Sequence, residues 1–359
     1  MIRLSCLAIL LMNLAGIISG STLCYGKFSG AQNSQFVQAE IDTIAEKMLL
    51  AQRVSGGWPK QINTVAFNYD NFWSQEFILK VKAGFSHPDA TIDNNATCRE
   101  IRYLIKAYNK TQSKTYLAAT ETGIWYLLKM QYANGGFPQF YPDTSGYKKH
   151  ITYNDDAMIN ALQILKDVSE GIQGFKIVSE DLRKRSALAV ERGIACILKT
   201  QIYVDGKPTV WCAQHDHITF LPAKARAYEL PSFSAAESVN ITRFLMEINN
   251  PSPQVKEAVL GALDWLYKSV IFGFKTQRIK DPAQPKGQDV VLVAAPGAKI
   301  WARFYDLETG KPFFCGRDGI KKATLAEIEN ERRTGYAYYG IWPEKLLVMQ
   351  YPDWHSGKK

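Results

Sequence analysis

The sequence lacks the composition of disordered, collagen-like and coiled-coil chains, and no segment is apolar for long enough to be a convincing membrane span. Of its 359 residues, 46% are hydrophobic, 12% aromatic and 21% charged, which is typical of a folded globular protein. Lys and Arg together number 43 against 34 for Asp and Glu, a net charge of +9. This excess favours an anionic partner, and charge alone leaves nucleic acid, a membrane surface and an acidic polysaccharide open.

Several catalytic motifs are also missing. The sequence contains no HExxH, no GxSxG, no phosphate-binding glycine loop and no dinucleotide-binding fingerprint. None of the six cysteines belongs to a CxxC pair, which argues against a zinc ribbon. Nucleic-acid-binding motifs are absent, and the basic residues are spread along the chain instead of clustering on one helix. We therefore expect no nucleic-acid partner.

The first residues have the pattern of a secretory signal peptide. Arg3 precedes an apolar run over 4–18, and small residues follow at 19–21. We expect residues 1–22 to be removed and the protein to be exported, to the periplasm or the extracellular medium. Cys24 raises the alternative of a lipid anchor, which the leucine just before it disfavours. We expect a monomer whose folded domain spans 34–356, with no stable membrane span.

Apolar residues recur at spacings of three and four, which predicts amphipathic helices. These helices pair into three hairpins at roughly 97–131, 155–199 and 234–271. A weak repeat supports this, because helices run into AQRVSGGWPKQ and, 79 residues later, MQYANGGFPQF; a third runs into TQIYVDGKPTVWCAQHD, which lacks the Gly-Gly pair. One helix pair cannot bury its own apolar faces, so stacked or circularised pairs are predicted. After about Phe272, short strands are predicted in QDVVLVAAPGA and ARFYDLETGKPFF.

Acidic and amide residues precede the first helix of two hairpins, in TIDNNAT and TYNDDAM. Asp93 and Asn94 lie in the first segment and Asp155 in the second, at equivalent places. One interpretation is helix capping, as for the candidate capping box of Ser234 and Glu237 in the third hairpin. If the first helices point the same way, these loops converge, and their oxygens form a site suited to calcium. The same carboxylates could instead be the acid and base of a glycosidase.

Basic residues stand in three other loops with aromatic neighbours. Lys224 and Arg226 lie in LPAKARAYELPS, Arg317 lies in FFCGRDG, and Arg332 and Arg333 lie in ENERRTGYAYYG. Arginine binds carboxylates through two parallel hydrogen bonds. Aromatic faces suit sugar rings, so these loops are typical of a carbohydrate cleft.

Many of these motifs, in one order, resemble the pectate lyases of polysaccharide lyase family ten. The resemblance extends from about residue 36 to 351 and rests on GGWPKQ, TIDNNATCREIRYL, NGGFPQFYP, ITYNDDAMINAL, VWCAQHD, LPAKARAYELPSFSAAES, WARFYDLETGKPFFCGRDG and ENERRTGYAYYG. It implies a mainly α fold, an (α/α)3 toroid of helical hairpins with a small added β region. It also implies that residues 34–356 are a catalytic domain that cleaves polygalacturonate, the acidic polysaccharide of pectin, by calcium-dependent β-elimination.

The resemblance also implies roles for individual residues. Asp93 and Asp155, with Asn94 beside them, are expected to bind calcium, and Arg226 is expected to remove the proton from C5 of the uronate. Substrate carboxylates are expected to contact Arg317, Lys224 and Arg333, with Arg332 as the alternative to Arg333. Because arginine is protonated near neutrality, either Lys224 and bound calcium favour its neutral form or the pH must be high, which predicts an alkaline optimum.

Two other functions remain compatible with the residues themselves. One is a glycoside hydrolase on a helical toroid with Asp93 and Asp155 as its acid/base pair. The other is a pectin-binding protein without catalytic activity. Elimination leaves a 4,5-unsaturated uronide that absorbs ultraviolet light, whereas hydrolysis and binding do not, so the product separates the three.

Overall fold

The computed structural model describes residues 41–355. The expected signal peptide over 1–22, the alternative lipid anchor at Cys24 and both predicted domain boundaries lie outside the described residues. Between residues 41 and 355, no helix combines the length and the apolar character that crossing a bilayer requires.

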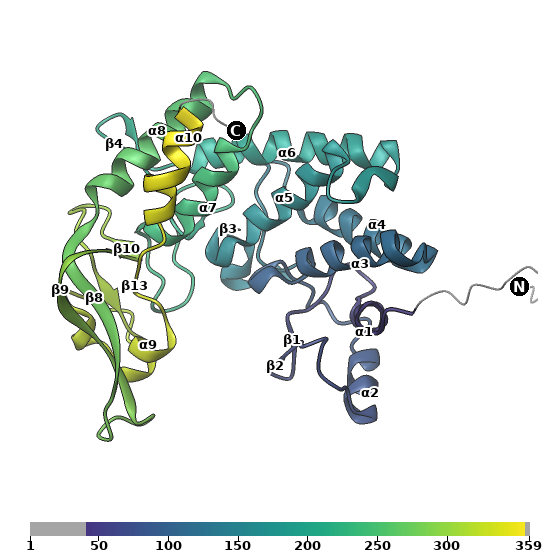
Figure 1. The fold of residues 1–359 in the computed structure, drawn as a ribbon, viewed down its shortest axis with the longest axis horizontal. Coiled ribbons are helices and arrows are strands. Elements are labelled where there is room, and N and C mark those ends of the chain that lie inside the picture. The colour runs from purple at the N-terminus through teal and green to yellow at the C-terminus, as the bar shows by residue number, and fades with distance from the viewer. Residues whose placement is uncertain (1–40, 356–359) are drawn as a thin grey trace, which may run out of the picture. The chain divides into compact units, whose positions relative to one another are not determined.

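Three helical hairpins form the main body of the fold, as predicted (Figure 1). The first helices of the hairpins contact one another in one row, and the second helices contact one another in a parallel row that α1 extends. α2 packs against α1. The helices are α1 (Thr43–Ala51), α2 (Gln75–Ala83), α3 (Cys98–Thr111), α4 (Lys114–Met130), α5 (Ala157–Glu170), α6 (Glu180–Thr200), α7 (Ala235–Met246) and α8 (Pro253–Lys268).

Local sequence accounts for these helices. In α5, Met158, Leu162 and Leu165 are fully buried and follow the spacing of three and four that keeps side chains on one helix face. Serine side chains start two of the second helices, because Ser179 accepts from the amide of Leu182 in α6 and Ser252 caps α8 in the same way. The hairpins therefore form from local signals and are stabilised by burial between the rows.

A glutamine follows α1, α4 and α6 and joins each of these helices to the next helix of the same row. Gln52, Gln131 and Gln201 occupy the same place in the three repeated segments, and each side-chain amide donates two hydrogen bonds of 2.7–3.0 Å. For each glutamine, one acceptor is a carbonyl in the loop that follows and the other is a carbonyl in the next helix of the row. The pairs are Gly56 and Ala119 for Gln52, Gly135 and Ala189 for Gln131, and Thr209 and Ala258 for Gln201. The weak sequence repeat is thus a structural repeat.

Tryptophans reveal a fourth copy of the repeat that the sequence analysis did not recognise. The indole N–H groups of Trp58, Trp211 and Trp301 each donate to a carbonyl near the end of the preceding helix, at 2.7–2.8 Å. Trp301 begins WARFYD, which corresponds to WCAQHD at Trp211. The fourth copy is difficult to recognise in the sequence because the spacing between copies is irregular. Trp211 follows Phe137 by 74 residues, whereas the intervening strands place Trp301 90 residues after Trp211.

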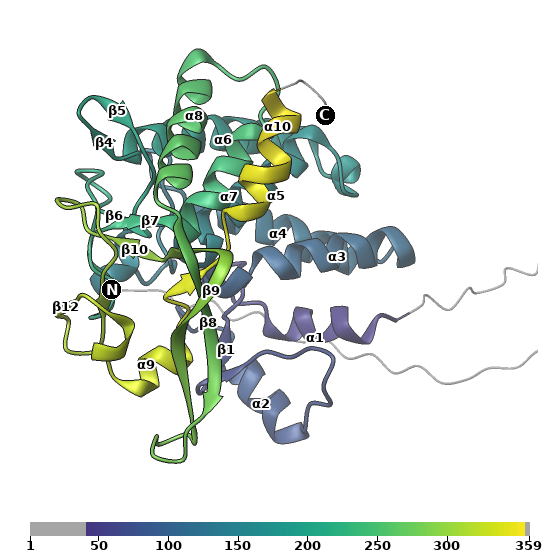
Figure 2. The ribbon, with the colours of Figure 1, turned by 60° about the vertical axis from the view of Figure 1, so that its left-hand side comes forward.

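The β region follows α8 and is longer than the predicted short strands (Figure 2). Strands β8 (Ile271–Lys280) and β9 (Gln288–Ala302) form a long antiparallel hairpin, and β13 (Tyr339–Gly340) pairs with the other edge of β9. Helix α9 (Asn330–Gly335) contacts β9, and α10 (Tyr351–His355) ends the described chain. Two-residue hairpins complete the region and the loops: β1 (Gln61–Ile62) with β2 (Val65–Ala66), β4 (Tyr203–Val204) with β5 (Lys207–Pro208), and β11 (Phe314–Cys315) with β12 (Lys321–Lys322).

Short antiparallel pairings close each hairpin at the end where its first helix begins. Thr91 bridges to Phe140, β3 (Ile151–Thr152) pairs with β6 (Gln214–His215), and β7 (Phe233–Ser234) pairs with β10 (Phe304–Tyr305). In each pair, one partner enters the first helix and the other follows the second helix. This arrangement brings the polar segments ahead of α3, α5 and α7 to one end of the hairpins.

Candidate active site

Two turns with the same backbone conformation precede α3 and α5. They are the 3₁₀ turns Asp93–Asn95 and Asn154–Asp156, and their middle residues, Asn94 and Asp155, have φ of 50° and 52°. Asn and Asp tolerate this left-handed region better than other side chains, which explains why DNN and NDD occupy it. The two acidic segments therefore lie at equivalent places, as the sequence analysis expected, with Asn154 as the counterpart of Asp93 and Asp155 as the counterpart of Asn94.

Helix capping does not explain these acidic residues. Neither α3 nor α5 has a side-chain hydrogen bond at its start, and Asp93 and Asp155 bond other groups. The capping box predicted for α7 is also absent, because Glu237 accepts from the Ser234 hydroxyl and from Arg303 instead of from a backbone amide at the helix start. The carboxylates are thus available for a ligand or for long-range ion pairs.

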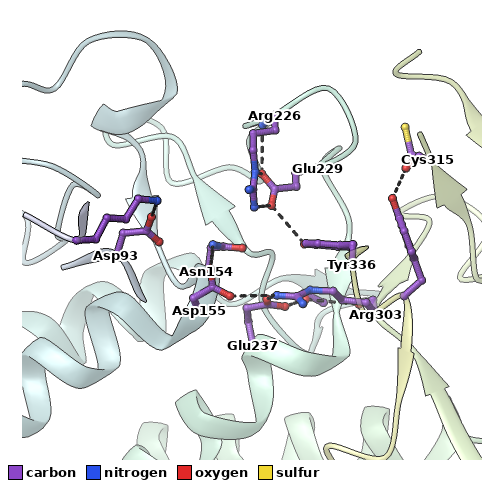
Figure 3. A network of polar contacts seen from close by, with 12 residues as sticks. Asp93, Asn154, Asp155, Arg226, Glu229, Glu237, Arg303, Cys315 and Tyr336 are labelled. Atoms are coloured by element: carbon purple, nitrogen blue, oxygen red, sulfur yellow. Dashed lines mark hydrogen bonds and ion pairs between the residues drawn. The ribbon is translucent and has the colours of Figure 1, made fainter. Parts of the chain in front are cut away.

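The two turns and Arg226 line one cavity of about 320 Å³. It brings together Asp93, Asn94, Asp155 and Arg226, which the sequence analysis selected from three distant segments. Figure 3 shows Asp93 and Asp155 on either side of Asn154, with Arg226 and Tyr336 nearby. The other lining residues are Lys60, Gln139, Phe140, Tyr147, Lys148, Asn154, Arg303, Gly335, Tyr336 and Ala337.

Several oxygens of this cavity lack partners among residues 41–355. Asp93 and Asn154 are 3% and 2% exposed, yet Asp93 Oδ1, Asn154 Oδ1 and Gln139 Oε1 accept no hydrogen bond there. The other oxygen of Asp93 pairs with Lys60, and Asn154 donates to Asp155 at 2.8 Å. Buried oxygens without partners are costly, and an all-oxygen donor set of this kind fits a hard cation such as calcium.

Arg303 is a functional candidate that the sequence analysis missed. It is 9% exposed, forms an ion pair with buried Glu237 and lies 3.8 Å from Asp155, a contact visible in Figure 3. The cavity walls partly desolvate the Asp155 carboxylate, which raises its pKa, while Arg303 acts in the opposite direction. The sequence contained one signal that could have identified Arg303. It is a charged residue between Trp301 and Phe304 in WARFYD, at the position that alanine occupies in WCAQHD.

Arg226 is held by Glu229. Its Nε donates to Glu229 at 2.7 Å, its second hydrogen bond goes to the other carboxylate oxygen, and its guanidinium lies over the ring of Tyr228. Tyr336 donates to the same carboxylate at 3.3 Å. Burial lowers the pKa of Arg226, but the hydrogen bond and charge of Glu229 outweigh it and raise the pKa above its ordinary value. Glu229 therefore opposes the neutral form of Arg226 that a base requires.

The other predicted substrate residues do not line this cavity. Lys224 is exposed, Arg317 pairs with Glu331 at 3.0 Å, and Arg333 forms an ion pair with Asp289 beside a separate cavity. The alternative, Arg332, also pairs with Glu331. Their contact with substrate stays a prediction, and Lys60, Lys148 and Arg303 supply the cavity's additional cations.

Among the residues that line the cavity, cationic side chains outnumber carboxylates. Lys60, Lys148, Arg226 and Arg303 line it against Asp93 and Asp155, while Glu229 and Glu237 lie behind the arginines. Such a surface attracts an anionic ligand.

Comparisons with known proteins agree with the site. The family model described as pectic acid lyase matches residues 52–347. A family 10 polysaccharide lyase from Cellvibrio cellulosa is 32% identical, with a TM-score of 0.76, over 88% of this chain and 92% of that one. A mutant of that enzyme in complex with trigalacturonic acid matches with the same identity and TM-score over 86% and 92%. No curated protein matches.

These similarities confirm the expected fold class, a mainly α toroid of helical hairpins with an added β region. They also confirm the resemblance that the sequence motifs indicated. The chain belongs to the pectic acid lyase family and is a pectate lyase of polysaccharide lyase family ten.

Proposed function

We propose that this chain cleaves α-1,4-polygalacturonate by calcium-dependent β-elimination, with Arg226 as the base at C5. The observation that carries the proposal is the single cavity in which unpaired oxygens of Asp93 and Asn154 lie beside Asp155 and Arg226. The similarity to a lyase in complex with trigalacturonic acid supports an acidic sugar as the substrate.

Asp93, Asn94, Asn154 and Asp155 would hold the calcium ion. Their oxygens fit its preference for six to eight hard ligands, with substrate and water completing the set. Calcium supplies positive charge next to the uronate carboxylate and so stabilises the negative charge that develops at C5. Lys60 neutralises Asp93 in the present arrangement and is 28% exposed, so it can turn toward a substrate carboxylate instead.

Arg226 would receive the C5 proton. The electron pair of the broken C5–H bond forms the C4=C5 double bond, and the bond from C4 to the glycosidic oxygen breaks. Because Glu229 stabilises protonated Arg226, the neutral form is a minor species whose fraction rises with pH. We therefore keep the prediction of an alkaline optimum.

Arg303 and Lys148 would hold substrate carboxylates. The Nε atom of Arg303 is buried and has no hydrogen-bond partner among the described residues, so a carboxylate oxygen would satisfy it. Lys148 reaches the cavity while pairing with Asp143, which is partly exposed. Together with Lys60 they form a cationic lining for successive uronates.

Ultraviolet absorbance on polygalacturonate tests the proposal. We expect absorbance to rise with calcium and to stop when a chelator is added, and we expect Arg226→Ala and Asp155→Ala to lose most of the rate. Arg185→Ala, an exposed residue of α6, is the matched control. New reducing ends without absorbance would instead indicate hydrolysis by Asp93 and Asp155, and binding without either product would indicate a pectin-binding protein.

We also propose that the enzyme acts outside the cytoplasm as a monomer. Polygalacturonate is too large to enter a cell readily, so export directed by residues 1–22 would bring enzyme and substrate together. Light scattering of the exported protein tests the oligomeric state.

A further inference from the structure

Two histidines and an aspartate converge next to the active-site loops. One ligand atom from each of His150, Asp216 and His217 lies within 4.8 Å of the others. The Nδ1 atoms of His150 and His217 lie 4.0 and 3.9 Å from Asp216 Oδ2, which is too far for a hydrogen bond. Both Nδ1 atoms are buried and have no hydrogen-bond partner within residues 41–355. Such atoms are costly unless a further group lies between them.

The structural repeat shows what is unusual about Asp216. Its Oδ1 accepts from the amides of Ile218 and Thr219 and from the Thr219 hydroxyl. Asp306 of the fourth copy makes the same turn, and its Oδ2 pairs with Lys321. No lysine pairs with Asp216 in the part of the chain that the structure describes, where the two histidine nitrogens face the corresponding oxygen instead.

Both histidines are held in place by their surroundings. The backbone amide of His150 donates to the carbonyl of Tyr147 at 3.0 Å. The backbone carbonyl of His217 accepts from Asn134 at 2.7 Å, and its ring lies against Tyr132 with centroids 5.5 Å apart.

We propose that His150, Asp216 and His217 bind one divalent transition-metal ion, with zinc as the expected metal. Two imidazole nitrogens and one carboxylate suit zinc, whereas calcium prefers oxygen ligands only. At zinc bond lengths of about 2.0–2.2 Å, ligand atoms lie roughly 3.4 Å apart, so the cluster needs to contract only slightly. The side chains of His150 and His217 are 14% and 25% exposed, which leaves access for the ion and a water ligand.

The site would connect two loops that carry active-site residues. His150 follows the 3₁₀ turn Gly146–Lys149, whose Tyr147 and Lys148 line the cavity. Asp216 and His217 precede the loop that carries Arg226. A bound ion would therefore fix Lys148 and Arg226 relative to each other without touching the substrate.

Metal binding by the mature protein tests this inference. The protein is stripped with a chelator and titrated with zinc by calorimetry, and with cobalt, whose visible absorption reports nitrogen and oxygen ligation. We expect one ion per chain and a rise in melting temperature of several degrees when zinc is about a hundred times its dissociation constant. His150→Ala and His217→Ala should each abolish both effects, whereas His87→Ala, at an exposed position, should keep them.

Two further variants keep the test decisive. Asp155→Ala should bind zinc normally, because it alters only the proposed calcium ligands, and its failure on polygalacturonate would not affect this inference. His217→Gln, at a partly exposed position, replaces His217→Ala if that variant does not fold by circular dichroism. Zinc binding of wild-type strength in His217→Gln, or no binding by the wild-type protein, would overturn the inference.

Discussion

In the proposed mechanism, the rate depends on the protonation of a single guanidinium, that of Arg226. Arg226 must be neutral to accept a proton, yet it shares two hydrogen bonds with Glu229, and Tyr336 also donates to that carboxylate. Glu229 therefore orients Arg226 but also raises the pKa of the Arg226 guanidinium. The two effects can be separated by substitution.

Glu229→Gln should shift the pH dependence of kcat toward lower pH. Glutamine keeps one hydrogen bond but removes the negative charge, so the pKa of Arg226 falls and its neutral fraction rises at any given pH. A charge-assisted hydrogen bond to Arg226, whose side chain is 39% exposed, supports a shift of about one pH unit. The pH–rate profile of elimination measures it, with Arg226→Lys expected to be inactive. An unchanged profile would show that Glu229 does not control the protonation of the base.

Arg303 and Glu237 form the other decisive pair, and both are at least nine-tenths buried. Arg303→Leu should destabilise the fold by about 3 kcal/mol, because it leaves Glu237 charged and unpaired in the interior. Adding Glu237→Gln should recover a large part of that loss, since the uncompensated charge is gone. Urea unfolding of both single variants and the double variant measures the coupling. Additive losses would contradict a direct interaction.

At the scale of elements, the glutamines after α1, α4 and α6 join neighbouring helices of one row. Gln201→Leu should lower the free energy of unfolding by about 2 kcal/mol, because two buried carbonyls lose their donors. Gln254→Leu, at an exposed position of α8, is the control and should change it by less than about 0.5 kcal/mol. Equal effects in urea unfolding would mean that the glutamine does not join the hairpins.

Arg333 connects α9 to β9 through Asp289 and holds the pKa of that carboxyl below its usual range, mainly through its hydrogen bond. A lowered pKa stabilises the fold at neutral pH, and the contribution disappears as the pH falls below about 4. Arg333→Leu should therefore reduce stability more at pH 7 than at acidic pH, as urea unfolding at both pH values would reveal. If KM for polygalacturonate is unchanged, the substrate role predicted for Arg333 is wrong.

At the scale of the whole molecule, the net charge and the grouping of cations at one cavity should both favour binding of an acidic polysaccharide. The chain carries a net +9, and four cations line a cavity that contains two carboxylates. We expect kcat/KM on polygalacturonate to fall steadily as sodium chloride increases from low to physiological strength, because screening weakens long-range attraction. A trimer of galacturonic acid, with fewer charges, should show a weaker dependence. Identical salt dependence for the two substrates would contradict electrostatic steering.

The sequence by itself determined the helical hairpins, the family and the set of residues around which the site is built. Periodicity and the polar DNN and NDD segments are local features, so Asp93 and Asp155 could be selected before any coordinates, and the family motifs added Arg226. The recurrence of GGWP and GGFP motifs also indicated that the hairpins stack. These signals depend on neighbours within a few residues.

Tertiary structure alone decided which charges meet. Arg303 pairs with Glu237 across 66 residues and Lys60 with Asp93 across 33, whereas Arg317 and Arg333 find acidic partners away from the cavity. The partner of a cation depends on which loops the hairpins bring to the same end. The residues next to a lysine or arginine in the sequence do not indicate which loops those are. For this reason the sequence selected the two aspartates that line the cavity but not most of its cations.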